Sequence, residues 1–574
     1  MQYAEMEEVY SRWCREATED VDVALELKQM EGKPEKIEDA FYRSLSFGTG
    51  GLRGIIGAGT NRMNLYTVAQ ATQGAADYIC AHFPEGKRRA AISYDSRIKS
   101  RLFAETAAQV LAANGVEVKI FSRLMPTPCL SFAVRRLSCC LGIMITSSHN
   151  PARYNGYKVY GADGCQITSQ AAGEISERIG RLDVFRDVKR MELEEAVKGK
   201  LISVIGEDIV TAYIEAVKAQ SLLTEQTEAC RDMAIVYTPL NGTGLEPVTR
   251  VLKEMGYFNV HLMKEQEQPD GTFPTCPYPN PEVPQAMDLG IALAGRLKGE
   301  LLLATDPDCD RVGIAVKDGK GGYQRLSANE TGLLLLDYIC SRRKENGTMP
   351  AHPVMAKTIV TTALAETIAA HYGVQMVNLL TGFKYIGEYI GQLEAAGRES
   401  DFIFGFEESC GYLSGTYVRD KDGVNAALLI CEMAAFYLAR GESLLERLNR
   451  IYETYGCCLE TQHSYQFEGS AGARQMEEIM KAFRAKGANI RGLAVKQVLD
   501  YEQGLEGLPK SNVLKYVLED GGTVILRPSG TEPKLKLYLS VSSRKKEDLE
   551  EMERERAEAV ERFMENVRTG NSHE

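Results

Sequence analysis

The chain has 574 residues, of which 44% are hydrophobic and 25% are charged. This composition excludes a largely disordered chain, and the length predicts about three to five domains rather than a small disulfide-held scaffold. The chain has 67 Lys and Arg against 79 Asp and Glu, which gives a formal net charge of −12. That charge disfavours nucleic acid or an anionic lipid surface as a partner and favours an acidic enzyme.

The termini and the cysteines indicate the compartment. The first residues, MQYAEMEEVY, lack the basic region and apolar stretch of a secretory signal, and no run of about 18 apolar residues predicts a membrane span. The 14 cysteines include no CxxC pair and no spacing typical of zinc. We therefore expect a cytoplasmic protein with free thiols.

The first 30 or so residues are predicted to form one amphipathic helix, because Val9, Trp13, Ala17 and Val21 recur at helical spacing. Helices are also predicted at 102–115 and 545–567. Short apolar runs predict strands at 90–95, 116–122, 140–148, 233–240, 300–306, 401–408, 523–529 and 534–541. Alternating strands and helices predict βαβ units and mostly parallel sheets.

The first polar loop after a predicted strand is TSSHNP, residues 146–151. A hydroxyl at a strand end followed by His149 could be a nucleophile, and Ser148 is the candidate. The loop is not a G-x-S-x-G elbow, because Thr146 and Asn150 stand where that motif needs glycines. A plain turn before Pro151 explains the same residues and remains the alternative.

The second loop, DPDCDR, follows the apolar run LLLAT. Asp306, Asp308 and Asp310 alternate in a turn and could converge on Mg²⁺, which prefers oxygen ligands. An EF-hand is excluded, because Arg311 and Lys317 stand at its glycine and glutamate positions. The alternatives are a haloacid-dehalogenase-like phosphatase with Asp306 as nucleophile and a plain surface turn.

The third loop is GFEESCGY, residues 405–412. Its glycines bracket two carboxylates and a hydroxyl. Such groups suit hydrogen bonds to the hydroxyls of a polar ligand such as a sugar. A solvated acidic turn is the alternative.

The fourth loop is RPSGTEPKLKLY, residues 527–538. The guanidinium of Arg527, the hydroxyls of Ser529 and Thr531 and the backbone N–H groups around Gly530 predict a phosphate-binding loop. A tight turn is the alternative, to which Pro528 is equally suited.

Together, TSSHNP, DPDCDR, GFEESCG and RPSGTEPK, in this order, strongly resemble the α-D-phosphohexomutases. FGTGGLRG (47–54), YDSR (94–97) and YTPLNGTG (237–244) match as well, so the resemblance runs from about residue 40 to about residue 545. The GLRG, YTPLNGTG and GFEES segments are most similar to the phosphoglucomutase/phosphopentomutase branch, in particular to its bacterial-type α-phosphoglucomutases.

The resemblance implies an α/β fold: three similar α/β domains with mixed or parallel sheets and a smaller α+β C-terminal domain, around one central cleft. The expected domains are 1–200 with the phosphoserine loop, 201–325 with the metal loop, 326–455 with the sugar loop and 456–574 with the phosphate loop. The implied reaction moves phosphate between O1 and O6 of a hexose phosphate through a phosphoserine enzyme. Mg²⁺ is the implied cofactor, and glucose 1,6-bisphosphate the implied intermediate and activator.

The resemblance also implies roles for residues. Those expected around the reacting phosphate are Arg53, Ser148, His149, Lys158 and Lys421, with Lys421 a candidate for proton transfer. Those expected to bind substrate are Arg311, Glu407, Ser409, Arg527, Ser529, Gly530 and Thr531. The expected magnesium ligands are Asp306, Asp308, Asp310 and a phosphate oxygen on Ser148.

Two residues depart from the family pattern. Ser147 stands where many members have Ala, and Lys536 stands where Arg is expected.

The expected partner is a small-molecule sugar phosphate, with glucose favoured, ribose or deoxyribose phosphate next and mannose phosphate third. A sugar-phosphate phosphatase and a non-catalytic sugar-phosphate sensor are the alternatives of other classes, although a sensor would not need both Ser148 and the acidic triad. The oligomeric state stays open.

Overall fold

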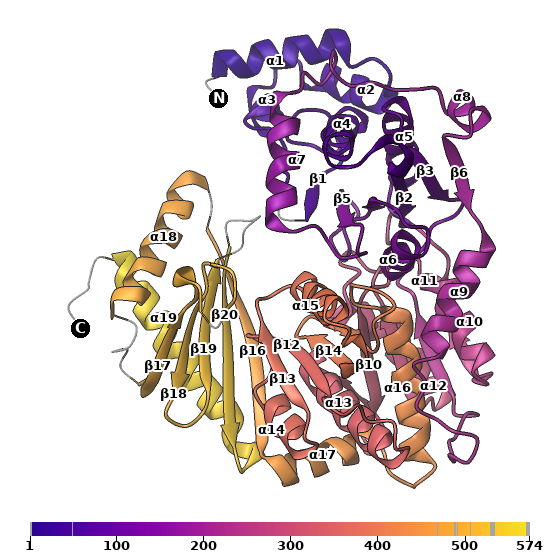
Figure 1. Cartoon of the computed structure of the whole chain (residues 1–574). Helices are drawn as coiled ribbons and strands as arrows, with labels where there is room; N and C mark the ends of the chain where they lie inside the picture. Colours follow the sequence, from indigo (N-terminus) through magenta and orange to yellow (C-terminus); the bar gives the residue numbers. More distant parts are fainter. Residues whose placement is uncertain are drawn as a thin grey trace. The chain divides into compact units, whose positions relative to one another are not determined.

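The computed structural model describes residues 3–48, 50–467, 469–486, 490, 492–505, 507–528 and 534–569 (Figure 1). The chain forms two compact units. The first comprises Met1–Ala328 and Ile386–Gly441, and the second comprises Asn329–Tyr385 and Glu442–Glu574.

Three helices precede the first sheet: α1 (Tyr3–Glu16), α2 (Val21–Met30) and α3 (Pro34–Phe41). The prediction of one helix over this segment is wrong. The Asp20 side chain accepts the backbone N–H groups of Asp22 and Val23 and so caps a new helix. As a result Val21 is 68% exposed instead of lying on the apolar face.

The first sheet has the order β1-β5-β4-β2-β3-β6. Strands β4, β2, β3 and β6 are parallel to one another, and β5 runs antiparallel to both of its neighbours, β1 and β4. Strand β4 is buried throughout, as expected of a strand covered by helices on both faces. The strands are β1 (Gly51–Ile55), β2 (Arg89–Tyr94), β3 (Glu117–Phe121), β4 (Leu141–Ile145), β5 (Tyr154–Gly161) and β6 (Ile202–Ile205). The helices are α4 (Leu65–His82), α5 (Ser100–Ala113), α6 (Thr127–Arg136), α7 (Ser169–Arg181) and α8 (Leu193–Lys198).

The second sheet has the order β11-β10-β9-β7-β8. Strand β7 is parallel to β8 and β9, and the antiparallel strands β10 and β11 complete one edge. The strands are β7 (Ile235–Thr238), β8 (Val260–Leu262), β9 (Leu301–Thr305), β10 (Val312–Lys317) and β11 (Tyr323–Leu326). The helices are α9 (Glu207–Lys218), α10 (Leu245–Glu254), α11 (Lys264–Glu267) and α12 (Pro284–Leu297).

The first unit also contains a short hairpin and a buried helix from later in the chain. Strand β14 (Phe402–Glu407) pairs antiparallel with β15 (Gly411–Leu413), after α15 (Phe383–Ala395). Helix α16 (Gly423–Leu438) follows and is apolar on nearly every face, as expected of a helix surrounded by protein. The β14–β15 turn carries the predicted sugar loop.

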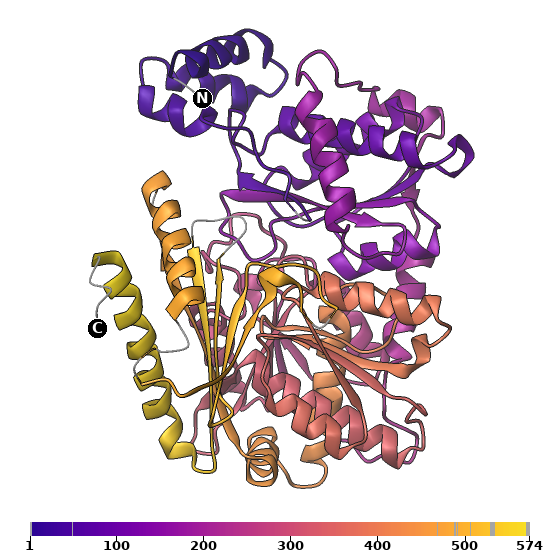
Figure 2. The same ribbon diagram turned by 60° about the vertical axis from the view of Figure 1, so that its left-hand side comes forward.

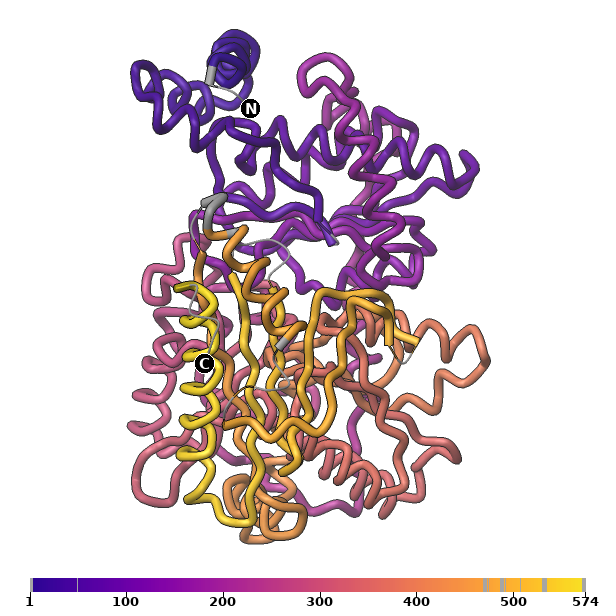
Figure 3. Tube along the Cα trace, turned by 90° about the vertical axis from the view of Figure 1, so that its left-hand side faces the viewer, coloured from indigo at the N-terminus to yellow at the C-terminus, as the bar shows by residue number. Residues whose placement is uncertain are grey.

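In the second unit, β12 (Val354–Thr358) and β13 (Gln375–Leu379) pair in parallel. The C-terminal sheet, β16-β20-β19-β18-β17, is antiparallel throughout. Helices α18 and α19 pack on one of its faces through a shared apolar core (Figures 2 and 3). The helices are α13 (Ala328–Glu345), α14 (Leu364–His371), α17 (Leu444–Tyr455), α18 (Gly469–Lys486) and α19 (Leu549–Thr569). The sheet strands are β16 (Cys457–Gln466), β17 (Val495–Asp500), β18 (Leu514–Leu518), β19 (Thr523–Pro528) and β20 (Lys534–Ser543).

The predicted fold class is confirmed: three α/β domains with mixed sheets precede an antiparallel C-terminal domain. The domain boundaries stay predictions. Among the helices described, none is both long and apolar enough to cross a membrane. All 14 cysteines are free thiols.

Candidate active site

Ser148 lies just beyond the C-terminal end of β4, in the first unit. Its Oγ donates a hydrogen bond to Oδ2 of Asp306 at 2.9 Å and lies 3.2 Å from Nδ1 of His149. Its backbone N–H is held by Oγ1 of Thr146 at 2.8 Å. The hydroxyl that the sequence singled out therefore faces the acidic loop, 158 residues further along the chain.

The acidic triad follows β9 and is buried. One carboxylate oxygen from each of Asp306, Asp308 and Asp310 lies within 4.8 Å of the others. Oδ1 of Asp308 and Oδ1 of Asp310 are buried without a hydrogen-bond partner. Burial and the two neighbouring carboxylates raise the pKa of Asp306 well above its ordinary value. A buried set of carboxylate oxygens, two of them without a hydrogen-bond partner, fits a hard divalent cation.

Three cationic side chains surround the triad. Lys158 Nζ lies 2.7 Å from Asp308 Oδ2 and 3.2 Å from Asp310 Oδ2. Lys421 Nζ lies 3.1 Å from Asp310 Oδ2. The Arg311 guanidinium lies 3.9 Å from Asp310 and pairs with Glu282. Positive charge is thus concentrated where a phosphate would meet the triad.

Burial and charge act in opposite directions on the lysines. Burial alone would lower the pKa of Lys421, but Asp310, Asp420 and Glu407 outweigh it and raise that pKa. The pKa of Lys158 is raised in the same way by Asp308 and Asp310. Both ammonium groups are therefore charged at neutral pH, which favours phosphate contact over proton abstraction for Lys421.

The predicted sugar loop lies beside Lys421. Glu407 is buried, accepts the Ser409 hydroxyl at 2.8 Å and lies 3.9 Å from Lys421 Nζ. A Cβ at Gly411 would lie 2.5 Å from Lys421 Cδ. The glycine therefore lets the loop approach the lysine, and the carboxylate, hydroxyl and ammonium form one polar surface.

Each of the three loops contains one non-glycine residue in the left-handed region: Ser148 (φ 50°), Cys309 (φ 51°) and Cys410 (φ 61°). This conformation costs about 1–2 kcal/mol for a residue with a Cβ. Such strain persists where the surrounding structure determines the backbone, and it is enriched at functional sites.

His149 and Arg53 complete the group near Ser148. Burial lowers the pKa of His149 strongly, and the charges of Arg311 and Arg53 lower it further. The imidazole is therefore neutral at physiological pH. Arg53 is exposed on β1, next to β5, which carries Lys158.

One residue of this site has no motif that would reveal it. Thr127, at the start of α6, donates through Oγ1 to Asp308 Oδ2 at 2.8 Å, and its N–H donates to the Asp308 carbonyl at 3.0 Å. The two residues are 181 positions apart. Proline residues on either side of Thr127 mark a helix start, but they do not indicate a contact with an acidic loop.

The fourth loop belongs to the second unit. Arg527 is half-buried near the end of β19 and faces Lys536 across the strand pair. Ser529, Gly530 and Thr531 lie outside the described residues, so the predicted phosphate grip stays a prediction.

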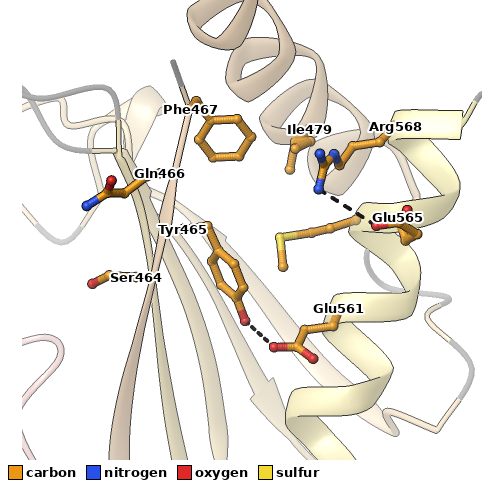
Figure 4. A pocket seen from close by; sticks show the side chains of 9 residues that line it. Ser464, Tyr465, Gln466, Phe467, Ile479, Glu561, Glu565 and Arg568 are labelled. Carbon is orange, nitrogen blue, oxygen red and sulfur yellow. Dashed lines mark hydrogen bonds and ion pairs between the residues drawn. The ribbon is translucent and has the colours of Figure 1, made fainter.

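A pocket of about 410 Å³ between β16, α18 and α19 is a separate feature of the second unit (Figure 4). Its lining includes Glu561, which accepts the Tyr465 hydroxyl, and Glu565, which pairs with Arg568. Two carboxylates and only one paired cation make it a poor site for a phosphate.

Comparison with known proteins bears on the whole chain. Four phosphoglucomutase/phosphomannomutase family models match it in order: α/β/α domain I at 44–184, domain II at 211–321, domain III at 327–455 and the C-terminal domain at 468–559. The chain is 35% identical over 536 residues to a phosphoglucomutase of Staphylococcus saprophyticus, covering 91% of this chain and 95% of that protein. The chain belongs to the α-D-phosphohexomutase family. A phosphoglucomutase of Staphylococcus epidermidis is 36% identical over 522 residues, with 88% and 92% covered.

Solved phosphohexomutase structures share the fold. Parafusin, a phosphoglucomutase of Paramecium in an open form, matches with a TM-score of 0.69 at 17% identity, covering 92% of this chain and 96% of that one. A phosphoglucomutase/phosphomannomutase family protein of Burkholderia thailandensis matches with a TM-score of 0.66 at 20% identity, covering 90% and 97%. This family of intramolecular phosphotransferases uses sugar phosphates, and the buried acidic triad is a candidate for its metal site.

Proposed function

We propose that this phosphohexomutase is a phosphoglucomutase, which interconverts glucose 1-phosphate and glucose 6-phosphate through phosphorylated Ser148 and a 1,6-bisphosphate. The observation that carries the proposal is the position of Ser148 Oγ, 2.9 Å from the buried triad. It is supported by 35% identity to curated phosphoglucomutases over nearly the whole chain. We further propose a cytoplasmic location.

Phosphoryl transfer depends mainly on positioning and on stabilising charge. In our proposal, Ser148 carries the phosphoryl group and donates it to the free sugar hydroxyl. Lys158, Arg53 and Arg311 bind its oxygens, and the neutral His149 ring, 3.2 Å from Ser148 Oγ, exchanges a hydrogen bond with the hydroxyl. Ser148 then accepts the other phosphate after the bisphosphate has turned.

Asp306, Asp308 and Asp310 would hold Mg²⁺, together with a phosphate oxygen on Ser148. When bound, the cation would supply positive charge that offsets the charge on the transferring phosphoryl group. Oδ1 of Asp308 and Oδ1 of Asp310, both buried without a hydrogen-bond partner, support this assignment. Thr127 would keep the Asp308 carboxylate oriented through its 2.8 Å hydrogen bond.

The substrate must bind in two orientations, with either phosphate beside Ser148. We propose that Glu407 and Ser409 bind sugar hydroxyls in both orientations. Arg527 and the residues of its loop, Ser529, Gly530 and Thr531, would bind the phosphate that is not reacting. Lys421, charged and 3.9 Å from Glu407, would contact a phosphate or a hydroxyl.

A coupled assay tests the proposal, with glucose 1-phosphate, ribose 1-phosphate and mannose 1-phosphate as alternative substrates. We expect the highest kcat/KM with glucose 1-phosphate, stimulation by glucose 1,6-bisphosphate and no release of inorganic phosphate. A preference for the pentose or for mannose would replace the assigned sugar. Stoichiometric release of inorganic phosphate would identify a phosphatase instead.

A further inference from the structure

The YDSR segment has no role in the proposed chemistry, yet its arginine donates hydrogen bonds to the backbone of the Ser148 loop. Arg97 is fully buried, at the turn between β2 and α5. Its Nη1 donates to the carbonyls of Pro151 and Tyr154 at 3.0 Å each. Its Nη2 donates to the carbonyls of Ser148 and Asn150. One guanidinium thus donates hydrogen bonds to four carbonyls of the seven-residue segment 148–154.

The arginine is itself held from two sides. Asp95 lies 3.2 Å from Arg97 Nε through Oδ2 and accepts the Arg97 backbone N–H at 3.0 Å through Oδ1. On the other side, the Phe273 ring lies 5.0 Å from the guanidinium carbon. The charged group is therefore shielded from water, where its hydrogen bonds are stronger than at a surface.

Asp95 also connects Arg97 to the nucleophile by a second route. Its Oδ2 accepts the Thr146 hydroxyl at 2.6 Å. The same hydroxyl oxygen accepts the backbone N–H of Ser148 at 2.8 Å. Both the N–H and the carbonyl of Ser148 are thus fixed by one buried Asp95–Arg97 pair.

We propose that Arg97, with Asp95 and Thr146, is a positioning residue that holds Ser148 in its left-handed conformation and directs Oγ toward Asp306. Fixing both the N–H and the carbonyl of Ser148 fixes the direction of its Cα–Cβ bond, and Oγ lies 2.9 Å from Asp306 Oδ2. A lysine could keep the charge but has a single donor atom in place of the planar fork, so it could not hold four carbonyls. The inference rests on the proposed role of Ser148 as the residue that carries phosphate.

The test compares Arg97→Lys with Arg62→Lys. Arg62 is also buried in the first unit and donates to main-chain carbonyls, those of Asp39 and Asn61, but it lies outside the Ser148 loop. We expect Arg97→Lys to lower kcat on the order of 100-fold with little change in KM, as for a misplaced reacting group. Phosphate incorporation at Ser148, followed by mass spectrometry, should slow in parallel. Arg62→Lys should change neither.

A second readout does not depend on the sugar. Hydrogen exchange of the amides in residues 146–155 should accelerate in Arg97→Lys and not in Arg62→Lys, in protein without ligand. Unchanged exchange and an unchanged kcat would overturn the positioning role. If the exchange result is as expected but wild-type protein shows no mutase activity, the proposed function fails and the loop-holding role stands.

If Arg97→Lys does not fold, Thr146→Val replaces it in both measurements. Valine keeps the branched shape but removes the oxygen that accepts the Ser148 N–H. We expect the same pattern with a smaller loss, roughly 10-fold in kcat, since one hydrogen bond is worth about that factor. Wild-type kcat and exchange in a folded Thr146→Val variant would contradict the proposal.

Discussion

Adjacent serines at the end of β4 differ in what their hydroxyls contact. Ser148 Oγ meets Asp306 and His149, whereas Ser147 Oγ is buried without a hydrogen-bond partner. We predict that Ser148→Ala abolishes mutase turnover. Ser147→Ala should keep most activity, and its stability should be equal or higher, because an unpaired buried hydroxyl is a cost. Steady-state kinetics and thermal melting of both variants check this, and reversed effects would show that Ser147 is the nucleophile.

At the triad, burial and the carboxylates of Asp310 and Asp308 raise the pKa of Asp306, and a bound divalent cation would offset that repulsion. We predict that Mg²⁺ raises the Tm of the wild type, since a ligand at 100 times its Kd stabilises by about 2.7 kcal/mol. Asp308→Asn should lose most of that increase and most activity. Asp288→Asn, an exposed carboxylate on α12, serves as control. Equal Mg²⁺ shifts in all three proteins, or full activity in excess chelator, would remove the metal from the site.

The site residues that the sequence predicted are marked by their neighbours in the chain, whereas those that it did not predict have roles that depend on distant contacts. Asp306 and Ser148 each follow a buried apolar strand, so the polar residue at the strand end stands out. Thr127 matches no motif, and Arg97 ends the matching YDSR segment without any sign of its role; their contacts lie 181 and about 50 residues away in the chain. No local pattern encodes such contacts, because they arise only when the strands are ordered side by side in the sheets.

At the scale of elements, an ion pair links the first N-terminal helix to the segment that follows α7. Arg12 on α1 binds Asp183, after α7, through two contacts of 2.7 Å. Apolar spacing predicted the helical content here but not the break before Val21. The Asp20 N-cap that starts the new helix is a local signal, whereas its ion pair with Lys99 is a tertiary contact. The Arg12–Asp183 ion pair makes the packing of the N-terminal helices sensitive to acid.

Arg12 lowers the pKa of Asp183 from 3.8 to about 2. A depressed carboxyl pKa stabilises the fold above the unfolded value, and the contribution is lost as pH falls through the folded value. With both side chains about 30% exposed, solvent screening limits it to about 1 kcal/mol. We predict that Arg12→Ala lowers the free energy of unfolding by about 1 kcal/mol at neutral pH. Calorimetry should show that, between about pH 3.8 and pH 2, the stability of the variant falls less steeply with pH than that of the wild type.

The control for this prediction is Arg101→Ala, which removes an exposed pair with Glu105 on α5. Its stability should stay close to wild type at every pH. If Arg12→Ala follows the wild-type pH profile, Arg12 is not the source of the Asp183 shift.

At the scale of the whole molecule, the proposed mechanism needs groups from all four domains for one turnover. Arg527→Ala tests the group that the second unit is proposed to contribute. A charge-assisted phosphate contact is worth about 1.5–3 kcal/mol, so kcat/KM should fall roughly 10- to 150-fold in both directions. Free 1,6-bisphosphate released per turnover should rise, because the turning intermediate is held less well.

Thermodynamics fixes the ratio of forward to reverse kcat/KM, so bisphosphate release is the decisive measurement. Arg554→Ala, an exposed arginine on α19, is the matched control. Unchanged release and unchanged kcat/KM in Arg527→Ala would mean that the C-terminal domain does not bind the non-reacting phosphate.

The chain has a single tryptophan, and its position makes it an optical reporter. Trp13 is 2% exposed, and its ring lies 5.4–5.8 Å from those of Phe41, Tyr66 and Phe185. Selective excitation of indole therefore reports only whether α1 is seated on its neighbours. Stronger quenching of the native enzyme's fluorescence by an added quencher would reveal that this segment detaches. A thermal melt followed by tryptophan fluorescence would not detect unfolding of the second unit.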